Sequence, residues 1–354
     1  MENLGINISI WNGKRVLVTG HTGFKGSWLT MWLKKKGAKV IGYSLENYPN
    51  DKLFNDCNLG EKIIDIRGDI RDSEKLKLLF EKYDPEFVFH LAAQPLVRES
   101  YNNPKETFET NIIGTINLLE CIRNSNVSGA VIITTDKVYK NKEWIWGYRE
   151  NDRLGGSDPY SSSKSCAELI VSSYKNSFLK KENKLIATAR AGNVIGGGDW
   201  SKDRLVPDCI RSLINTQPIK IRNPKSTRPW QHVLEPLSGY ILLGEKLLKK
   251  EKVDSEWNFG PKQELILPVK NIVEIMLEEW GSGEFHDLSN EQKNAPQEAG
   301  LLGLDISKAI FQLGWNPKLN IQETIRLTVN WYKNYNKINP YELCLKQIED
   351  YERK

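Results

Sequence analysis

The sequence has few of the residues that build disulfide-linked or metal-binding proteins. Its 354 residues include five cysteines and four histidines. The cysteines are scattered, odd in number and never spaced as Cys-x-x-Cys, which argues against a disulfide framework and against a zinc site. We therefore expect reduced, mostly structural cysteines and no metal centre.

Long apolar runs and basic blocks are also missing. No stretch approaches the roughly 20 apolar residues of a membrane span, and the start of the chain lacks the basic run and apolar core of a secretory signal. The net charge of +5 is spread along the chain, without the basic footprint of a nucleic-acid-binding protein. We expect a cytoplasmic protein that binds neither membranes nor nucleic acid and takes an anionic small molecule.

The N-terminal pattern is that of strand, glycine turn and helix. A β-branched run at 15–19 precedes the segment GHTGFKG at 20–26, and apolar residues at helical spacing follow. The spacing Gly-x-x-Gly-x-x-Gly permits a tight turn, close approach of a pyrophosphate and close packing of the helix on the strand. It predicts a dinucleotide site rather than an ordinary βα turn. The expected cofactor-binding residues of this loop are Gly20, Thr22, Gly23, Phe24, Lys25 and Gly26.

The choice between NAD and NADP depends on the end of the second strand, at 39–43. An acidic residue normally meets the adenosine ribose there, but this chain offers Ser44 and Leu45, with Glu46 slightly late. No arginine stands where it would favour a 2′-phosphate. The sequence favours NAD.

Strands and helices keep alternating up to residue 190, which predicts an α/β fold with a doubly wound parallel (Rossmann) sheet. The expected strands are 63–67, 87–91, a strand at Val131 and 185–190, and the expected helices are 73–83, 105–123 and one after Tyr160.

The alternation breaks down after residue 190. We expect an NAD-binding domain at 1–190 and a smaller, mainly substrate-binding lobe at 191–354. A helical pattern at 233–248 has the spacing of a helix packed on the sheet, so the chain is expected to return to the first domain near 230–250, with an interleaved boundary. The residues after Ile338 are expected to form a surface helix or a frayed tail.

The strand at Val131 ends in three polar residues, Thr135, Asp136 and Lys137. Its apolar and β-branched run predicts burial on both faces. Because ligands bind at the carboxyl ends of strands in open α/β sheets, a hydroxyl, a carboxylate and an amine arriving together form a candidate site. An ordinary polar strand exit is the alternative.

Tyr160 and Lys164 are spaced as Tyr-x-x-x-Lys at the start of a predicted helix, which puts the phenol and the amine on one face. A lysine ammonium beside a phenol lowers the phenol's pKa, so Tyr160 could take a proton from a substrate hydroxyl while hydride leaves the same carbon. An exposed helix pair is the alternative, and the upstream glycine loop favours the catalytic interpretation.

These motifs together resemble the extended short-chain dehydrogenase/reductase superfamily, the NAD-dependent epimerases and dehydratases, over nearly the whole chain. The segments that carry this likeness are 20–26, 68–70, 91–93, Thr135, and Tyr160 with Lys164. The longer segments 20–28, 91–98, 135–137, 190–200 and 228–233 resemble the CDP-glucose branch of the nucleotide-sugar 4,6-dehydratases.

The resemblance implies oxidation of a glucose C4 hydroxyl by NAD, loss of water across C5 and C6, and return of the hydride to C6. Tyr160 would be the base at O4, and Thr135 would bind the same oxygen. Asp136 would be the acid at C6, and Lys137 the base at C5, where most related dehydratases have glutamate. Whether Lys137 is the base or only holds Asp136 in a salt bridge is open at this point.

The resemblance also assigns binding residues. Besides the glycine loop, Tyr160 and Lys164, the cofactor would contact Asp69, Ile70, Leu91, Ala92, Ala93 and Gln94. The nucleotide sugar would contact Asn193, Asp199, Trp200, Arg204, Arg228 and Trp230. Trp144 and Trp146 are further candidates for walling the sugar or the base. His21 is equally a phosphate ligand or a loop filler, His90 is expected in the core, and His232 could be either.

Three questions stay open. A sugar-nucleotide 4-epimerase or reductase on the same fold, a dehydratase for another nucleotide sugar, and a catalytically idle dinucleotide-sensing protein are rivals. No residue pattern in the sequence identifies cytosine as the base, so the choice of nucleobase depends on the resemblance alone. A homodimer formed through the helices at 105–123 and 160–178 is likewise carried over from the superfamily.

Overall fold

The computed structural model describes residues 9–46, 51–262, 267–289 and 301–354. Its centre is a seven-stranded sheet, ordered β11-β6-β5-β4-β1-β2-β3, in which every neighbouring pair is parallel. The predicted doubly wound parallel sheet is therefore confirmed. The strands are β1 (Arg15–Thr19), β2 (Lys39–Ser44), β3 (Ile64–Arg67), β4 (Phe87–His90), β5 (Gly129–Ile133), β6 (Leu185–Ala191) and β11 (Glu256–Phe259).

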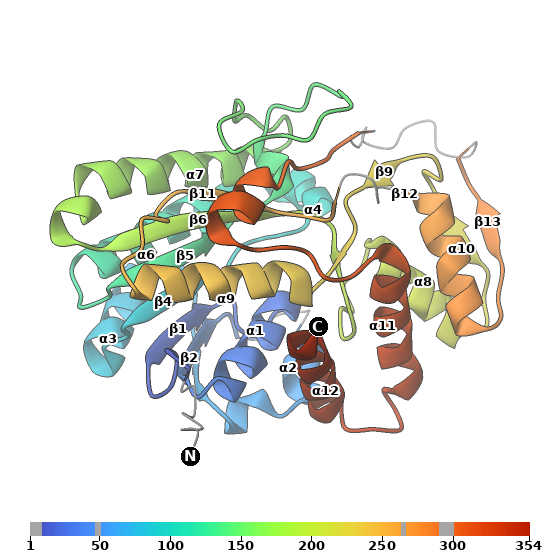
Figure 1. The fold of residues 1–354 in the computed structure, drawn as a ribbon, viewed down its shortest axis with the longest axis horizontal. Coiled ribbons are helices and arrows are strands. Elements are labelled where there is room, and N and C mark those ends of the chain that lie inside the picture. The colour runs from blue at the N-terminus through green and yellow to red at the C-terminus, as the bar shows by residue number, and fades with distance from the viewer. Residues whose placement is uncertain (1–8, 47–50, 263–266, 290–300) are drawn as a thin grey trace, which may run out of the picture.

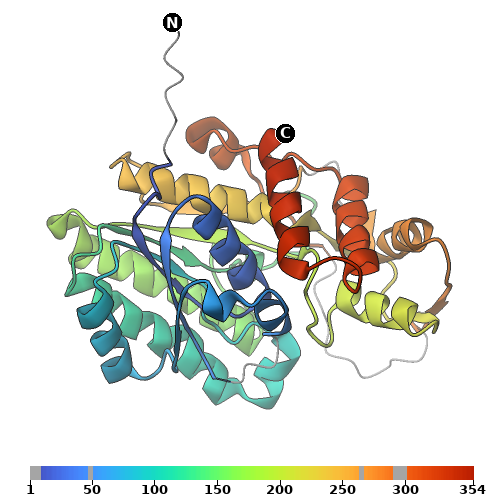
Figure 2. The same cartoon turned by 90° about the horizontal axis from the view of Figure 1, so that it is seen from below.

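Helices cover both faces of this sheet, as Figures 1 and 2 show. Each strand alternates its side chains between two apolar cores: Val16 and Val18 of β1 join one core, and Leu17 joins the other. The first core lies under α1 (Phe24–Lys35) and α9 (Leu234–Leu248). The second lies under α3 (Ser73–Tyr83), α6 (Gly114–Arg123) and α7 (Pro159–Ser177).

The start of α7 follows from its capping residues. The Asp158 side chain accepts a hydrogen bond from the Ser161 backbone nitrogen, and Pro159 occupies the first helical position. The predicted helix at 105–123 is also present, but it begins as α5 (Pro104–Phe108) and passes through a wider turn, η2 (Glu109–Ile113), before α6.

Several short elements were not predicted, because none has enough residues for a clear period. They are α2 (Lys52–Asp56), η1 (Leu59–Glu61), α4 (Val97–Asn102), η3 (Asp136–Val138) and η4 (Leu179–Glu182). Two of them, α4 and η3, follow the carboxyl ends of β4 and β5.

A smaller lobe is built from the later part of the chain and lies beside the sheet domain in Figures 1 and 2. Its helices are α8 (Leu205–Ile214), α10 (Val269–Trp280) and α11 (Ile321–Asn334). Its short strands are β7 (Val194–Ile195), β8 (Ile219–Ile221), β9 (Thr227–Arg228), β10 (Gln231–His232), β12 (Leu267–Pro268) and β13 (Phe285–Asp287). The turn η6 (Ala309–Leu313) comes before α11 in the chain but packs against β11 of the sheet domain.

The chain returns to the sheet domain after residue 230. Helix α9 packs against β5 and β6, and β11 pairs in parallel with β6. We propose on this basis that the boundary between the two lobes is interleaved.

The last residues form a surface helix, α12 (Pro340–Arg353), which buries Cys344, Ile348 and Tyr351. The frayed tail allowed by the sequence is therefore wrong for this segment. Within the described ranges, none of the helices is both long and apolar enough to cross a membrane.

Candidate active site

The glycine loop lies where the order of the strands reverses. The chain runs from β1 outward to β2 and β3, then returns to the other side of β1 with β4. The loops that follow β1 and β4 therefore flank the crevice in which such sheets bind ligands. Gly20 has a φ of +71°, and a Cβ there would lie 2.7 Å from the Ala92 backbone nitrogen. A Cβ on Gly26 would overlap the Gly20 carbonyl oxygen, so both positions require glycine.

The adenosine end of the loop is held by hydroxyl groups. Thr22 is buried, and its Oγ1 lies 2.8 Å from the Oγ of Ser44 at the end of β2. The Tyr43 hydroxyl donates to the Asp69 carbonyl oxygen at 2.8 Å, and Ile70 is buried beside Gly114. The predicted cofactor residues Asp69 and Ile70 thus lie next to the end of β2.

His21 turns away from the crevice. Its ring is fully buried, its Nε2 lies 2.9 Å from Asp65 Oδ1, and it packs edge-on against Phe54. A Cβ on Gly42 would overlap this ring. Burial lowers the pKa of His21, while Asp65 opposes that shift. Of the two roles left open by the sequence, the structure favours the loop filler.

The segment after β4 is tied to β1. The Leu91 nitrogen donates to the Thr19 carbonyl oxygen at 3.0 Å, and the Ala92 nitrogen donates to Thr19 Oγ1 at 3.2 Å. The Gln94 side chain donates to the Leu96 carbonyl oxygen and to Thr107 Oγ1. Ala92 therefore lies beside the end of β1 at the crevice, while the side chain and the backbone of Gln94 are engaged within the protein, the backbone with the Asn111 amide.

Thr135 and Asp136 lie at the carboxyl end of β5, one strand further along. Thr135 Oγ1 donates to Asp136 Oδ1 at 2.9 Å. Asp136 is 1% exposed, and its Oδ2 has no hydrogen-bond partner within the described part of the chain. A Cβ on Gly192, which follows β6, would overlap that oxygen. Burying a carboxyl oxygen without a hydrogen bond costs free energy. A bound ligand that donates a hydrogen bond to this oxygen would remove that cost.

Lys137 is the second residue of the short turn η3, which follows β5, and its side chain is half-buried. Its backbone nitrogen donates to Thr135 Oγ1 at 3.4 Å. Among the residues that the structure describes, its ammonium forms no ion pair within 4 Å, with Asp136 or any other acid. The alternative that Lys137 only holds Asp136 in a salt bridge lacks the contact that it requires.

Tyr160 and Lys164 reach the same strand end from α7. The Tyr160 hydroxyl is hydrogen-bonded to the Thr135 side chain, and Lys164 Nζ donates to the Ile133 carbonyl oxygen at 3.3 Å. Burial raises the pKa of Tyr160 to about 12, against the lowering effects of Thr135 and the Arg204 charge. Lys164, which the sequence predicted to lower this pKa, is not among the groups that do so here.

Lys25, which belongs to the glycine loop, interacts electrostatically with the residues at the end of β5. Burial, together with the charges of Lys164 and Arg204 and against the effect of Asp136, lowers the pKa of Lys25 to about 7. Its Nζ lies 5.8 Å from the centre of the Tyr240 ring. The loop and the strand end thus share one electrostatic environment, in which Lys25 interacts with Lys164, Arg204 and Asp136.

Arg204 is the predicted substrate residue that the structure links most directly to this group. Its charge acts on both Lys25 and Tyr160. Its Nη1 donates to Asp199 Oδ2 at 3.2 Å, and the other Asp199 oxygen accepts from the Ser201 nitrogen. Asp199 is 3% exposed. Asp199 therefore holds Arg204 within the protein.

The remaining predicted substrate residues lie on separate elements of the smaller lobe. Arg228 is buried on β9 beside β12, and its Nη1 donates to the Thr227 carbonyl oxygen at 2.7 Å. Asn193 follows Gly192 with a φ of +44°, and its carbonyl accepts from the Gln231 nitrogen. Trp230 is partly buried.

The other tryptophan and histidine candidates have structural surroundings. Trp200 packs edge-on against Tyr332 and Tyr335 of α11. Trp144 packs on Tyr148, and Trp146 is 65% exposed on the surface. His90 and His232 are both buried, and burial lowers the pKa of each to about 3. These two histidines are neutral core residues.

Sequence reasoning missed two residues that shape the site. The first is Gly192, whose backbone lies so close to the Asp136 carboxylate that a side chain would not fit. The second is Glu168, which lies one helical turn beyond Lys164 with its carboxylate buried against Thr134 and Thr188. The spacing of four between Lys164 and Glu168 was a visible signal for the second. Gly192 gave no signal, because its neighbour Asp136 lies far away in the chain.

We predict that Gly192→Ala displaces Asp136, because the added methyl group takes the place of Asp136 Oδ2. Turnover should fall while substrate still binds, and the fall should exceed that of Gly260→Ala, where the nearest atom to an added Cβ is 3.5 Å away. Steady-state kinetics of the two variants provide the measurement. Equal activities in the two variants would show that the position of Asp136 does not matter.

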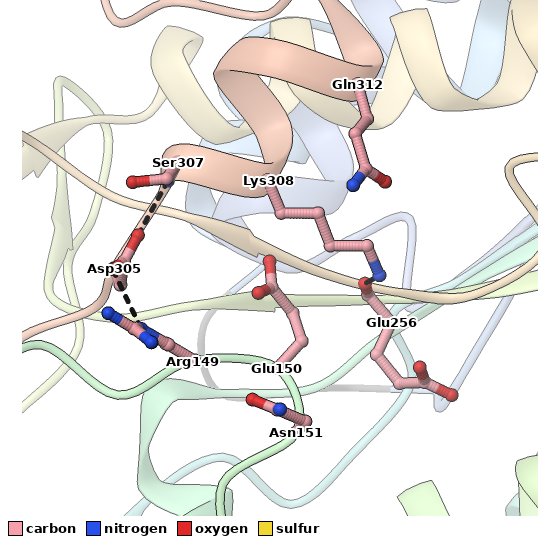
Figure 3. Close-up of a pocket in the computed structure, with 8 residues that line it drawn as sticks. All are labelled: Arg149, Glu150, Asn151, Glu256, Asp305, Ser307, Lys308 and Gln312. Atoms are coloured by element: carbon pink, nitrogen blue, oxygen red, sulfur yellow. Dashed lines mark hydrogen bonds and ion pairs between the residues drawn. The ribbon is translucent and has the colours of Figure 1, made fainter.

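A separate polar pocket of about 430 Å³ lies outside this group of residues. Figure 3 shows that its charged side chains largely pair with each other or with backbone: Arg149 with Asp305 at 3.4 Å, and Lys308 with the Glu256 carbonyl oxygen at 2.7 Å. None of the predicted site residues lines it. The lining residues are Arg149, Glu150, Asn151, Glu256, Asp305, Ser307, Lys308 and Gln312.

Comparisons with known proteins agree with this geometry. The model of the GDP-mannose 4,6 dehydratase family matches residues 17–328. A CDP-glucose 4,6-dehydratase from Salmonella typhimurium is 50% identical over 98% of this chain and 98% of its own length.

Solved structures share the fold at lower identity. UDP-glucose 4-epimerase from Thermotoga maritima has a TM-score of 0.81 at 23% identity, covering 91% of this chain and 100% of its own. A dTDP-glucose 4,6-dehydratase from Bacillus anthracis, solved with NAD, has a TM-score of 0.76 at 22% identity, covering 93% of this chain and 100% of its own. At these identities the structures show the fold alone.

Proposed function

The chain belongs to the GDP-mannose 4,6 dehydratase family, and from this premise we propose that it is an NAD-dependent lyase that converts CDP-glucose into CDP-4-dehydro-6-deoxyglucose. The observation that carries the proposal is the group at the end of β5. There Thr135 contacts both Tyr160 and Asp136, and Lys137 follows with its amine unpaired among the described residues. CDP-glucose as the substrate rests on the relative at 50% identity.

The first step is oxidation at C4 of the glucose. Tyr160 takes the proton of the 4-hydroxyl, and Thr135 orients that oxygen through the hydrogen bond that it shares with the phenol. The residues of the glycine loop would hold NAD, which would supply the acceptor for hydride from C4 and its donor to C6. Since burial holds the phenol protonated, positive charge is needed to release its proton. Arg204 supplies part of that charge. We assign the remaining positive charge to Lys164, which lies one turn further along α7.

The second step is loss of water. The 4-ketone acidifies the proton on C5, and the Lys137 amine removes it. Asp136 gives a proton to the leaving C6 hydroxyl, which departs as water. Addition of hydride at C6 and of a proton at C5 would complete the product. Asp136 is buried and its Oδ2 has no partner among the described residues, so that oxygen can bond to the C6 hydroxyl.

The cofactor fits the glycine loop at the strand reversal. Gly20 and Gly26 leave no room for side chains, so the backbone can approach a pyrophosphate, and Asp69 and Ile70 lie beside the end of β2. Lys25, Tyr160 and Lys164 face the reacting end. The structure contains Ser44 where an acid usually meets the ribose, and we retain NAD as the cofactor.

We predict that Lys25→Met binds NAD⁺ more tightly. The nicotinamide of NAD⁺ is cationic, and Lys25 adds a third positive charge to Lys164 and Arg204. Because the pKa of Lys25 is about 7, the gain in affinity should be larger at pH 6 than at pH 8.5, where the amine is already neutral. Calorimetric titration at both values provides the measurement. An equal affinity for wild type and variant at pH 6 would contradict it.

The substrate pyrophosphate is assigned to arginines. Arg204 projects from the start of α8 toward Tyr160 and Lys25, and Arg228 stands on β9, so guanidinium groups from two elements can bind phosphate oxygens. Asn193, Trp230 and, through Arg204, Asp199 complete the proposed binding set. Trp200 packs on α11 and is assigned a supporting role.

Incubating the purified protein with NAD⁺ and CDP-, dTDP-, UDP- or GDP-glucose, without reductant, tests the proposal. A 4-keto-6-deoxy product should form fastest from CDP-glucose. A 4-epimer of unchanged mass would establish the epimerase alternative, and preference for another nucleotide would move the protein to another dehydratase branch.

We further propose a cytoplasmic homodimer. Helices α6 and α7 lie side by side on one face of the sheet, and Leu169 on α7 is 59% exposed. Sedimentation of the wild-type protein and of Leu169→Glu provides the test. A monomeric wild type would contradict it.

A further inference from the structure

We propose that Glu168 is a positioning residue for the redox step: its carboxylate fixes Thr134, the residue before Thr135, and places a negative charge one helical turn from Lys164. This inference rests on the proposed function and names a residue for the C4 oxidation that neither the sequence motifs nor the comparisons assign.

The Glu168 carboxylate is 3% exposed and accepts four hydrogen bonds. Thr134 Oγ1 on the β5 side donates at 2.5 Å, and Thr188 Oγ1 on β6 donates at 2.7 Å. Arg190 donates from Nε at 2.9 Å and from Nη2 at 2.8 Å. Both carboxylate oxygens are therefore saturated, which fixes the side chain in one orientation.

The position of Glu168 on α7 connects this network to the reacting groups. Tyr160, Lys164 and Glu168 are spaced by four residues and share one face of the helix. Lys164 donates to the Ile133 carbonyl and Glu168 accepts from Thr134, so the helix is attached to β5 at two consecutive residues. Thr135 is the next residue along. A shift of Thr134 would move the hydroxyl that contacts Tyr160.

An ion pair between Glu168 and Arg190 that only stabilised the core would not require the two threonine contacts. Arg190 has further partners, because its Nη1 donates to the Tyr139 hydroxyl at 2.8 Å and to the Glu150 carbonyl at 2.9 Å. The threonine contacts give Glu168 a directional role that simple charge neutralisation does not require.

The charge of Glu168 also acts on Lys164. Burial lowers the pKa of Lys164 to about 8, and Glu168 is the group that opposes this shift. The other groups facing Lys164 are Lys25, whose own pKa is about 7, and His90, which is neutral. Removing the Glu168 charge should lower the pKa of Lys164 further, so its ammonium form would be lost at a lower pH.

Two matched variants test the positioning role. Thr134→Val and Thr188→Val each remove one hydroxyl that donates to the same carboxylate, but only Thr134 adjoins Thr135. Thr134→Val should lower the kcat of CDP-glucose conversion about tenfold with KM within twofold, and Thr188→Val should lower kcat less than threefold, as a single hydrogen bond is worth about a factor of ten at most when it orients a reacting group. Equal effects of the two variants would overturn the proposal.

A charge-balanced pair of substitutions tests the electrostatic role. Glu168→Gln with Arg190→Met removes both charges together, which avoids leaving a buried arginine without its partner. The alkaline limb of the kcat profile should move to lower pH by half a unit or more. Lys175→Met, on the same helix and also engaged in a buried contact, is the control and should leave the limb in place.

The outcomes separate this inference from the proposed function. A wild-type protein that does not convert CDP-glucose refutes the function. An active wild type combined with an unmoved alkaline limb in the folded double variant refutes the role of the Glu168 charge. If the double variant does not fold, the comparison of Thr134→Val with Thr188→Val decides the positioning role by itself.

Discussion

Replacing Tyr160 by phenylalanine is expected to lower turnover about 1000-fold, within the range that a general base contributes. The phenol contacts Thr135 at the strand end, and Tyr160 is the proposed base for the 4-hydroxyl proton. Substrate affinity should change little, because the phenylalanine ring keeps the packing. Stopped-flow formation of reduced cofactor provides the measurement of the oxidation step.

The pH dependence gives this prediction a second measurement. Burial keeps the phenol protonated, so the rate of C4 oxidation in the wild type should rise with pH through the neutral range, and the rise should vanish in Tyr160→Phe. Tyr174→Phe, further along the same helix, is the matched control and should behave as the wild type does. A Tyr160→Phe enzyme with more than a tenth of wild-type turnover would remove Tyr160 as the base.

Replacing Lys137 by alanine is expected to stop the reaction after its first step. Tyr160, Thr135 and Lys164 remain in place for C4 oxidation, but the proton on C5 loses its base, so turnover should fall about 100-fold or more. Reduced cofactor should then accumulate to a level near that of the enzyme, since hydride cannot return until water has left. Absorbance of the reduced nicotinamide after mixing with substrate provides the measurement.

The control for this prediction is Lys140→Ala. Lys140 is exposed and lies three residues further along the same segment, so its loss removes a similar charge without removing the proposed base. It should show wild-type turnover and no accumulated reduced cofactor. Normal turnover in Lys137→Ala would assign the C5 base to another residue.

The sequence predicted the sheet domain closely, because that part of the fold is specified by local signals. The strand at 15–19 and the helix at 73–83 have the predicted bounds, since a β-branched run or an apolar period ends at a clear polar or glycine boundary. The strand β11 and helices α8, α10 and α11 were not predicted individually. Proline-punctuated segments there obscure the period, and β11 becomes a strand only by pairing with β6.

In the candidate site, too, some features could be predicted from local motifs and others could not. Motif spacing predicted that Tyr160 and Lys164 share a helix face and that Thr135 lies at a strand end, and the structure brings the three to one place. Spacing could not show that Lys25 reaches the charges of Lys164 and Arg204, or that Gly192 presses on Asp136. These contacts arise when separate strands end at the same edge of the sheet, which no local pattern records.

The pairing of Asp199 with Arg204 shows the same limit at short range. The two residues are five apart in the chain, and the resemblance assigned both to the substrate. Only the structure shows that one oxygen of Asp199 holds Arg204 and the other caps the following turn. The resemblance selected this segment, and the structure adds that Asp199 holds Arg204 within it.

Conversion of CDP-glucose in deuterium oxide tests the central claim most directly. The product should be lighter than CDP-glucose by one water, should carry solvent deuterium at C5, and should form with catalytic NAD⁺ that is fully oxidised at the end. Mass spectrometry and nuclear magnetic resonance of the product provide these results. Recovery of an epimer with unchanged mass, or of a dehydrated product without deuterium at C5, would contradict elimination by Asp136 and Lys137.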